Sequence, residues 1–85
     1  MAERTILILC ITDRVKHATE VQRVLTKYGC NIKTRLGLHE AGSNVCSANG
    51  LVFLELVGAS AEFDGLEQVL QKIQGLDVRR LAFKI

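Results

Sequence analysis

The order of apolar and polar residues divides the chain into two halves with the same pattern. Residues 5–12 and 51–57 are almost continuously apolar, and each run is too short for an ordinary helix. A near-continuous apolar run of this kind predicts a central β-strand of a sheet. A helical pattern follows each run, with apolar side chains three or four residues apart. Its members are Ala18, Val21, Val24, Leu25 and Tyr28 in the first half, and Phe63, Leu66, Leu70 and Ile73 in the second.

Small polar residues and glycines mark the ends of these helices. Thr12 and Asp13 precede the first helix and Ser60 precedes the second, and such side chains cap free N–H groups at a helix start. Gly29 and Gly75 follow the helical stretches, where glycine often takes the left-handed conformation that ends a helix. The pattern predicts a helix between each pair of markers.

Alternating patterns predict one further strand at the end of each half. Residues 31–38 and 78–85 alternate, and residues 39–50, rich in Gly, Ser and Asn, predict a loop. In the first of these strands one face carries Ile32, Thr34, Leu36 and Leu38 and the other Lys33, Arg35 and Gly37. In the last strand one face carries Leu81, Phe83 and Ile85 and the other Arg80, Ala82 and Lys84.

The repeat predicts the architecture. Strand, helix and strand occur twice, about 46 residues apart, and neither half can bury its own apolar stripe. We therefore expect one α+β domain over residues 1–85, with the ferredoxin-like βαββαβ fold. Its four-stranded antiparallel sheet carries both helices on one face.

The other face of this sheet is predicted to meet a partner. Leu51 and Phe53, beside Glu55, would form an apolar centre, with Lys33 and Arg35 on one edge. Arg80 and Lys84 would flank the opposite edge. An apolar centre with a charged rim is typical of an interface, and so small a domain gains stability from covering it. We predict a homodimer or homotetramer; the alternative is that edge side chains fold over this face.

Composition restricts the environment and the partners. The 85 residues carry a formal charge of only +2, far from what phosphate backbones require. The first strand has no aromatic residue and the third has only Phe53, so direct nucleic-acid binding is not expected. The longest apolar run, Ile6–Ile11, is too short to span a membrane. Cysteines 10, 30 and 46 cannot all pair and form no CxxC, which indicates a reducing, cytoplasmic location.

Few residues suggest chemistry. No Ser–His–Asp set or carboxylate pair can be placed, and Thr12-Asp13-Arg14 lacks a Gly-rich anion cradle, so neither catalysis nor a cofactor is expected. His39 and Cys46 would form half of a site for zinc, nickel, copper or cobalt. Their simpler interpretation is a polar residue at a strand end and a small loop residue. Cys10 is predicted to be a small core residue.

Short motifs suggest a family. Residues 28–32, Tyr-Gly-Cys-Asn-Ile, resemble the G-x-N-I turn of ACT domains, which are small-molecule-sensing regulatory modules. Residues 35–39, 54–56 and 75–78, together with Cys46 and Gly50-Leu51, resemble a family of short stand-alone proteins named iron-only hydrogenase system regulators. Their fold is similar to that of ACT domains and of the C-terminal domain of the nickel-responsive repressor. The resemblance covers residues 4–83.

This resemblance implies a non-catalytic module that assembles through its sheet. ACT domains bind amino acids between two copies, near the turn from the first strand to the first helix. Here the matching residues are Thr12, Asp13 and Arg14, with Asn31 from the ACT-like turn. The Pro-Gly pair that often follows the Asp is missing, so a side chain stands where a ligand would approach the backbone.

We therefore predict a regulatory or small-ligand-sensing module, with a small molecule and a regulatory protein as candidate partners. The alternatives are a metal-responsive module that uses His39 and Cys46, or a purely structural interaction domain.

Overall fold

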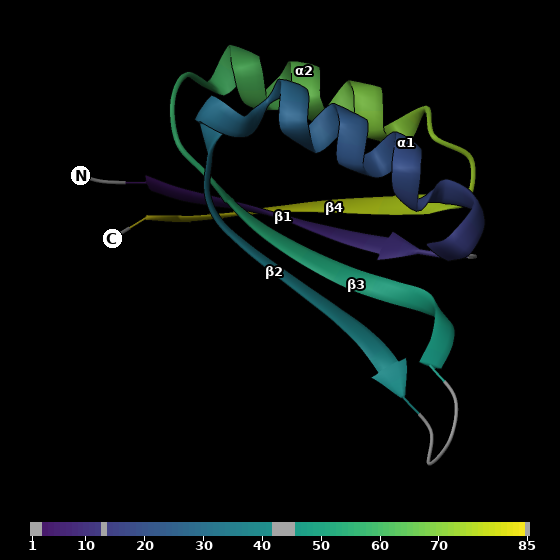
Figure 1. Cartoon of the computed structure of the whole chain (residues 1–85). Helices are drawn as coiled ribbons and strands as arrows, with labels where there is room; N and C mark the ends of the chain where they lie inside the picture. The colour runs from purple at the N-terminus through teal and green to yellow at the C-terminus, as the bar shows by residue number, and fades with distance from the viewer. Residues whose placement is uncertain (1–2, 13, 42–45, 85) are drawn as a thin grey trace.

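The chain folds into one sheet with two helices (Figure 1). The computed structural model describes residues 3–12, 14–41 and 46–84, and the side chains of these residues apart from 14–18, 38–41 and 46–49. The elements are β1 (Glu3–Ile11), α1 (Arg14–Lys27), a 3₁₀ turn (Gly29–Asn31), β2 (Ile32–Ala41), β3 (Cys46–Leu56), α2 (Ser60–Gln71) and β4 (Leu76–Lys84).

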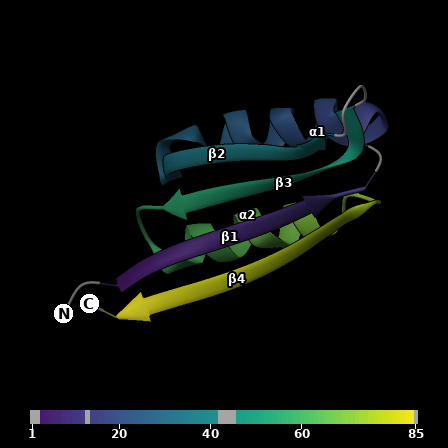
Figure 2. The same cartoon turned by 90° about the horizontal axis from the view of Figure 1, so that it is seen from below.

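The sheet has the predicted ferredoxin-like topology. Its strand order is β2-β3-β1-β4, and every neighbouring pair is antiparallel. Both helices lie on one face, and the other face carries no element of the described chain (Figures 1 and 2). In the part of the chain that the structure describes, no helix is both long enough and apolar enough to cross a membrane.

The core lies between this sheet and the helices. The largest fully buried side chains among the described residues are leucines: Leu7, Leu9, Leu54, Leu66 and Leu70. From Thr5 to Ile11 in β1 and from Val52 to Leu56 in β3, every second side chain points into this layer, because successive side chains of a strand alternate between faces. The apolar stripe predicted for the second helix is buried in full. In the first, Val21, Val24 and Leu25 are buried, whereas the side chain of Ala18 lies outside the described residues.

The loop predicted over residues 39–50 is wrong at both ends. β2 continues to Ala41 and β3 begins at Cys46, with Ala41 paired to Cys46 and His39 to Gly50. Gly, Ser and Asn are poor strand formers on their own, but β-propensity depends strongly on context. Here each strand pairs with the other, and the resulting backbone hydrogen bonds override the local preference.

The predicted helix ends are confirmed only in part, and Asp13, one of the two caps predicted for the first helix, lies outside the described residues. The hydroxyl of Thr12 donates to the carbonyl oxygen of Gly75 at 2.8 Å, so it joins two loops. The residue before α2 is Ala59, which makes no side-chain cap, and Ser60 is already helical. Gly29 lies in the 3₁₀ turn without a positive φ, whereas Gly75, after α2, has the predicted left-handed conformation with φ of 82°; Gly58 also has a positive φ, of 117°.

A β-bulge changes the faces of β2. Ile32 pairs with Leu56, which faces the helices, whereas Thr34 pairs with Glu55 on the other side. Lys33 is therefore the extra residue of the bulge, and Ile32 packs against the core. The predicted grouping of Ile32 with Thr34 was wrong, because simple alternation assumes a regular strand.

Candidate functional site

The side of the sheet that faces away from the helices is the candidate functional site, and we call it the open face. All four strands contribute to it, and the pairing register places their side chains in rows. One row holds Leu36, Phe53, Ile8 and Arg79, and the next holds Thr34, Glu55, Ile6 and Leu81. The open face therefore has apolar side chains on every strand.

The apolar side chains of the open face are unusually exposed. Leu36 is 52% exposed, Leu81 46% and Phe83 51%, and Leu51 is also exposed. Ile6, Ile8 and Phe53 in the central strands are half-buried. Single exposed hydrophobic residues are common, but a contiguous group of this size marks an interaction surface.

A charged pair lies within this apolar surface. Arg4 donates two hydrogen bonds to the carboxylate of Glu55, from Nε at 2.7 Å and from Nη2 at 2.9 Å. The Glu55 side chain is only 13% exposed, against 52% for Arg4. A two-point contact of this kind fixes the relative orientation of both groups. The pair is thus a fixed polar feature at one end of the open face.

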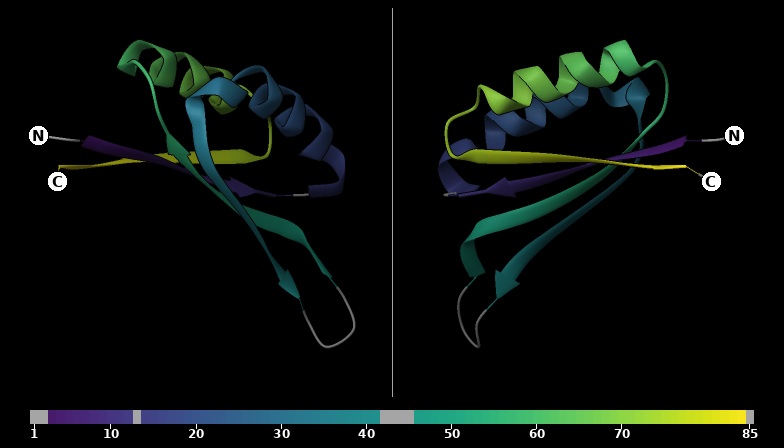
Figure 3. Two further views of the ribbon diagram at one scale, coloured as in Figure 1. Left: turned by 60° about the vertical axis from the view of Figure 1, so that its left-hand side comes forward. Right: turned by 180° about the vertical axis from the view of Figure 1, so that it is seen from behind.

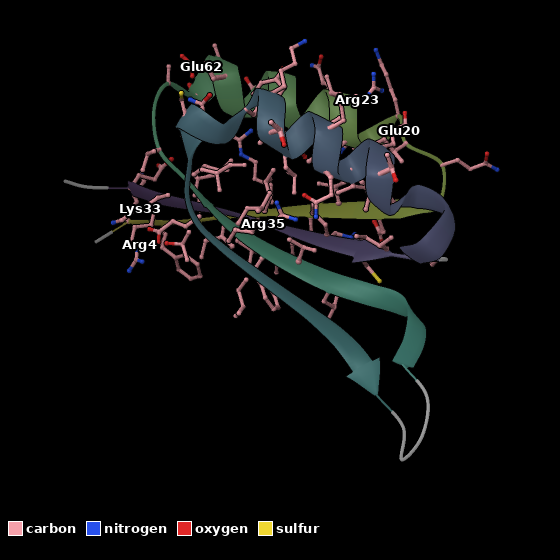
Figure 4. The ribbon with its side chains drawn as sticks, viewed as in Figure 1. Arg4, Glu20, Arg23, Lys33, Arg35 and Glu62 are labelled. Atoms are coloured by element: carbon pink, nitrogen blue, oxygen red, sulfur yellow. The ribbon has the colours of Figure 1, made fainter. Side chains whose placement is uncertain are left out.

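Lys33 adds positive charge near this pair. Figure 4 shows Lys33 and Arg4 at the same end of the sheet. The hydrogen bonds from Arg4, with the charges of Arg4 and Lys33, hold the pKa of Glu55 below its ordinary value of 4.5. They outweigh the partial burial of the carboxylate, which raises the pKa. Glu55 is therefore ionised at neutral pH.

The other end of the open face carries Cys10, Asp77 and Arg79. Arg79 forms a surface ion pair with Asp77, with 3.2 Å between Nη2 and Oδ2. Cys10 is paired in register with Asp77 and with Leu51, and it is exposed. The prediction that Cys10 belongs to the core was wrong. Successive side chains of β1 alternate between the two faces of the sheet, and Cys10 falls on the open face.

The predicted interface residues divide between the two faces. Leu51 and Phe53 lie on the open face as expected. Arg35 pairs with Leu54, which is buried against the helices, so Arg35 belongs to the helix side of edge strand β2. The bulge at Lys33 is the reason, because regular alternation from Ile32 would have placed Arg35 on the open face.

Arg80 and Lys84 were also expected at the rim of the open face, and they lie on the helix side. Arg80 Nη1 donates to Asp64 at 2.5 Å and to Glu67 at 3.3 Å, both on α2. Its guanidinium also lies 5.8 Å from the ring centre of Phe63. The apolar residues of β4, Leu81 and Phe83, consequently occupy the open face. The strand alternates as predicted, but the assignment of its two faces was reversed.

The residues predicted to bind a small ligand do not come together in one chain. Thr12 follows the end of β1 that pairs with Gly50, whereas Asn31 precedes the end of β2 that pairs with Leu56. Some six residues of strand separate these ends, or roughly 20 Å. Asp13 lies outside the described residues, as does the side chain of Arg14.

Asn31 has contacts of its own. Its amide nitrogen donates to the carbonyl oxygen of Val57 at 3.1 Å and to the carboxylate of Glu62. The backbone N–H of Val57 in turn donates to the carbonyl oxygen of Asn31 at 2.8 Å. These bonds join the start of β2 to the start of α2, where Figure 4 shows Glu62. Within one chain the Asn31 amide therefore has a structural role.

His39 and Cys46 stand near the end of the β2–β3 hairpin. Cys46 pairs with Ala41, two positions along β2 from His39, which pairs with Gly50. The side chains of both residues lie outside the described part of the structure. Among the side chains that are described, no three His, Cys, Asp or Glu residues gather as metal ligands would.

The sequence placed Glu55 on the open face beside Leu51 and Phe53, where the structure has it, but missed the contributions of Leu36, Leu81, Phe83 and Arg4. The position of Glu55 was predictable, because it interrupts an otherwise apolar strand and lies two residues from Phe53 and four from Leu51. Its partner, Arg4, could not be found in this way, because the register of β1 against β3 decides which residues meet.

Comparison with known proteins supports the fold. No protein-family model matches the chain, and no curated protein matches it. An uncharacterized protein from Thermotoga maritima has a similar structure, with a TM-score of 0.82 at 23% identity over 98% of this chain and 100% of that one. The ACT domain of a GTP pyrophosphokinase from Chlorobium tepidum gives a TM-score of 0.65 at 19% identity, over 92% and 96% of the two chains.

A third similar structure is a nitrogen regulatory PII-like protein from Thiomonas intermedia K12, bound to ADP, AMP and bicarbonate. Its TM-score is 0.54 at 14% identity, over 99% of this chain and 96% of that one. At these identities the likeness concerns the fold alone. The chain has an ACT-like ferredoxin fold.

Proposed function

We propose that this protein is a non-catalytic regulatory module that senses a small ligand and self-associates through the open face. The observation that carries the proposal is the contiguous apolar surface around Ile8, Phe53 and Leu81, with Leu36 and Phe83 half exposed beside it. Its fold is shared by an ACT domain and by a PII-like protein with bound nucleotides, which supports a sensing role.

A more specific functional assignment rests on the sequence motifs. We propose that the chain acts in the manner of the iron-only hydrogenase system regulators, in the cytoplasm and as a single domain over residues 1–85. Such a role would require a second, regulatory protein to pass the signal on.

The proposed ligand site lies between two copies. Thr12 and Arg14, the described neighbours of Asp13 in the sequence, lie at or beside one end of the sheet and Asn31 at the other, so one molecule cannot bring them to a single ligand. A dimer whose strands run antiparallel would place the Thr12 end of one copy beside the Asn31 end of the other. Self-association would then be a condition for sensing.

Self-association is tested by native mass spectrometry and sedimentation of protein purified without chelator. The expected result is a dimer or tetramer at low micromolar concentration. Leu81→Lys adds a charge to the open face and should give a monomer that remains folded, since Leu81 is half exposed. Gln68→Lys is the matched control, because Gln68 is exposed on α2. A monomeric wild type, or an oligomer unaffected by Leu81→Lys, would contradict the proposal.

Ligand sensing is tested by thermal shift with the proteinogenic amino acids and with adenine nucleotides as probes. A ligand at 100 times its dissociation constant should stabilise the fold by about 2.7 kcal/mol. The Arg14→Ala variant should lose this stabilisation and still associate. A panel without effect, together with an intact oligomer, would favour the purely structural module.

The metal-responsive alternative is supported by the position of His39 and Cys46 on paired strands of one hairpin. It predicts binding of zinc or nickel that weakens as the pH falls, because both ligands must lose a proton. His39→Ala and Cys46→Ala should each abolish it. Retention of metal by both variants would exclude these residues as ligands.

A further inference from the structure

The far end of the β2–β3 hairpin extends beyond the rest of the sheet. The pairing of β3 with β1 stops at Gly50, opposite Ile11, but β3 begins four residues earlier, at Cys46. We call the described strands beyond this point, residues 40–41 and 46–49, the arm. Within the described chain the arm has a neighbour on neither outer edge.

The arm gives the molecule an elongated shape. The principal extents are 46 × 24 × 18 Å and the radius of gyration is 13.3 Å. A compact domain of this length would have a radius of gyration of about 12 Å. Figures 1 and 3 show the hairpin descending away from the helices, on the side of the sheet where the open face lies. Any molecule seated on the open face would therefore lie next to the arm.

Two-stranded ribbons without further neighbours are at best marginally stable in water. Their outer edges present backbone N–H and C=O groups that a partner can cover or bind. The arm is such a ribbon, since the helices pack over the body of the sheet (Figure 3). Its backbone geometry is therefore better suited to an assembled state than to an isolated chain.

The area of the open face also indicates that the arm takes part in assembly. Four strands about 4.8 Å apart and some 25 Å long have a flat footprint of roughly 500 Å². A standard interface buries about 800 Å² on each partner. The two strands of the arm, each about 13 Å long, add roughly 125 Å² to this footprint. The surface of the same copy that contacts the partner's arm adds roughly 125 Å² more. The sum, roughly 750 Å² on each copy, approaches the standard value.

We infer that the arm of each copy packs against a second copy of this chain that covers the open face. The inference rests on the proposed self-association and adds a second contact to it. A second copy is the occupant that the geometry favours, because in an isologous pair each molecule provides one open face and one arm. The two arms then lie at opposite ends of the dimer, each packed against the other copy.

The inference is tested by shortening the hairpin. Replacing residues 40–49 with Asn-Gly closes a two-residue turn between His39 and Gly50, which are already paired. The expected result is a dimer dissociation constant at least tenfold higher than that of the wild type. An unchanged constant would overturn the role of the arm and leave association through the open face intact. A wild type that is monomeric throughout would overturn both.

A second measurement needs no shortened chain. Amide hydrogen exchange of residues 46–49 is compared between the wild-type dimer and the Leu81→Lys monomer, with the Gln68→Lys protein as the control. Exchange in the arm should be at least tenfold slower in the dimer. Equal exchange in dimer and monomer would show that the arm does not contact the second copy.

Discussion

Glu55 is a largely buried carboxylate within the open face. It lies on a central strand among apolar neighbours, and two hydrogen bonds from Arg4 satisfy its carboxylate. Removal of either partner would leave the other charged and unpaired on a surface that the proposed self-association would cover. The cost of such a group rises when it loses contact with water. This pair should therefore affect both folding and association.

The Arg4–Glu55 pair predicts how stability responds to acid. Because the pKa of Glu55 is lowered in the folded protein, its ionised form favours folding above the ordinary value of 4.5. This contribution is lost as the pH falls through the lower, folded value. Glu55→Gln should therefore be less stable than the wild type at neutral pH, with a difference that shrinks below about pH 4.

Urea unfolding of both proteins between neutral pH and pH 3 measures this difference. The Glu20→Gln variant is the control, since Glu20 is exposed on α1 and faces Arg23 at 3.9 Å. A difference between wild type and Glu55→Gln that is the same at every pH would contradict the prediction.

Gly58 is constrained by its backbone conformation and by the close approach of Asn31. Its φ of 117° is rarely adopted by other residues, and a Cβ there would lie 2.7 Å from the Asn31 amide nitrogen. Gly58→Ala should cost about 1–3 kcal/mol of unfolding free energy, from backbone strain and displacement of Asn31. Gly29→Ala should have little effect, because its Cβ would meet no atom within 4 Å. Chemical denaturation compares the two; equal losses would show that the turn adapts.

At the scale of elements, α2 is joined to the sheet by an apolar and a polar contact. Leu66 and Leu70 are fully buried, while Arg80 of β4 reaches Asp64 and Glu67 on the same helix. The hydrogen bond to Asp64, with the nearby carboxylates, raises the pKa of Arg80 above its ordinary value. A charged side chain on the helix side of β4 is thus accommodated at the edge of the core.

The apolar contact should dominate the stability of α2. Leu66→Ala removes a fully buried side chain and should cost about 2–5 kcal/mol, from lost burial and the cavity left behind. Gln68→Ala, two residues away on the exposed side, should change stability by less than about 0.5 kcal/mol. Equilibrium unfolding in urea measures both values, and a loss below about 1 kcal/mol for Leu66→Ala would mean that the core repacks.

At the scale of the whole molecule, self-association predicts a melting temperature that depends on protein concentration. A tenfold increase favours the dimer by about 1.4 kcal/mol. For a pair of chains of this size the shift should be about 3–5 °C. Differential scanning calorimetry over two decades of concentration measures it. Leu81→Lys should melt at one temperature throughout, and a concentration-independent wild type would argue against a stable dimer.

Much of the fold could be predicted from local patterns. The two apolar runs and the stripe around Leu66 and Leu70 predicted strands and a helix, because burial imposes periods of 2 and 3.6 on the sequence. The candidate site was harder to predict from the sequence. Arg80 and Leu81 alternate in any register, and only the packing of α2 decides which of them faces the helices.

Periodicity and the repeated pattern along the chain determined the strands, the helices and their order, since these depend on neighbours a few residues apart. The tertiary structure decided what depends on distant residues. It placed the bulge at Lys33, extended the hairpin through residues that favour loops, and brought Arg4 to Glu55 across two strands. Pairing register is responsible for each of these features, because moving a strand by one residue transfers every side chain to the other face.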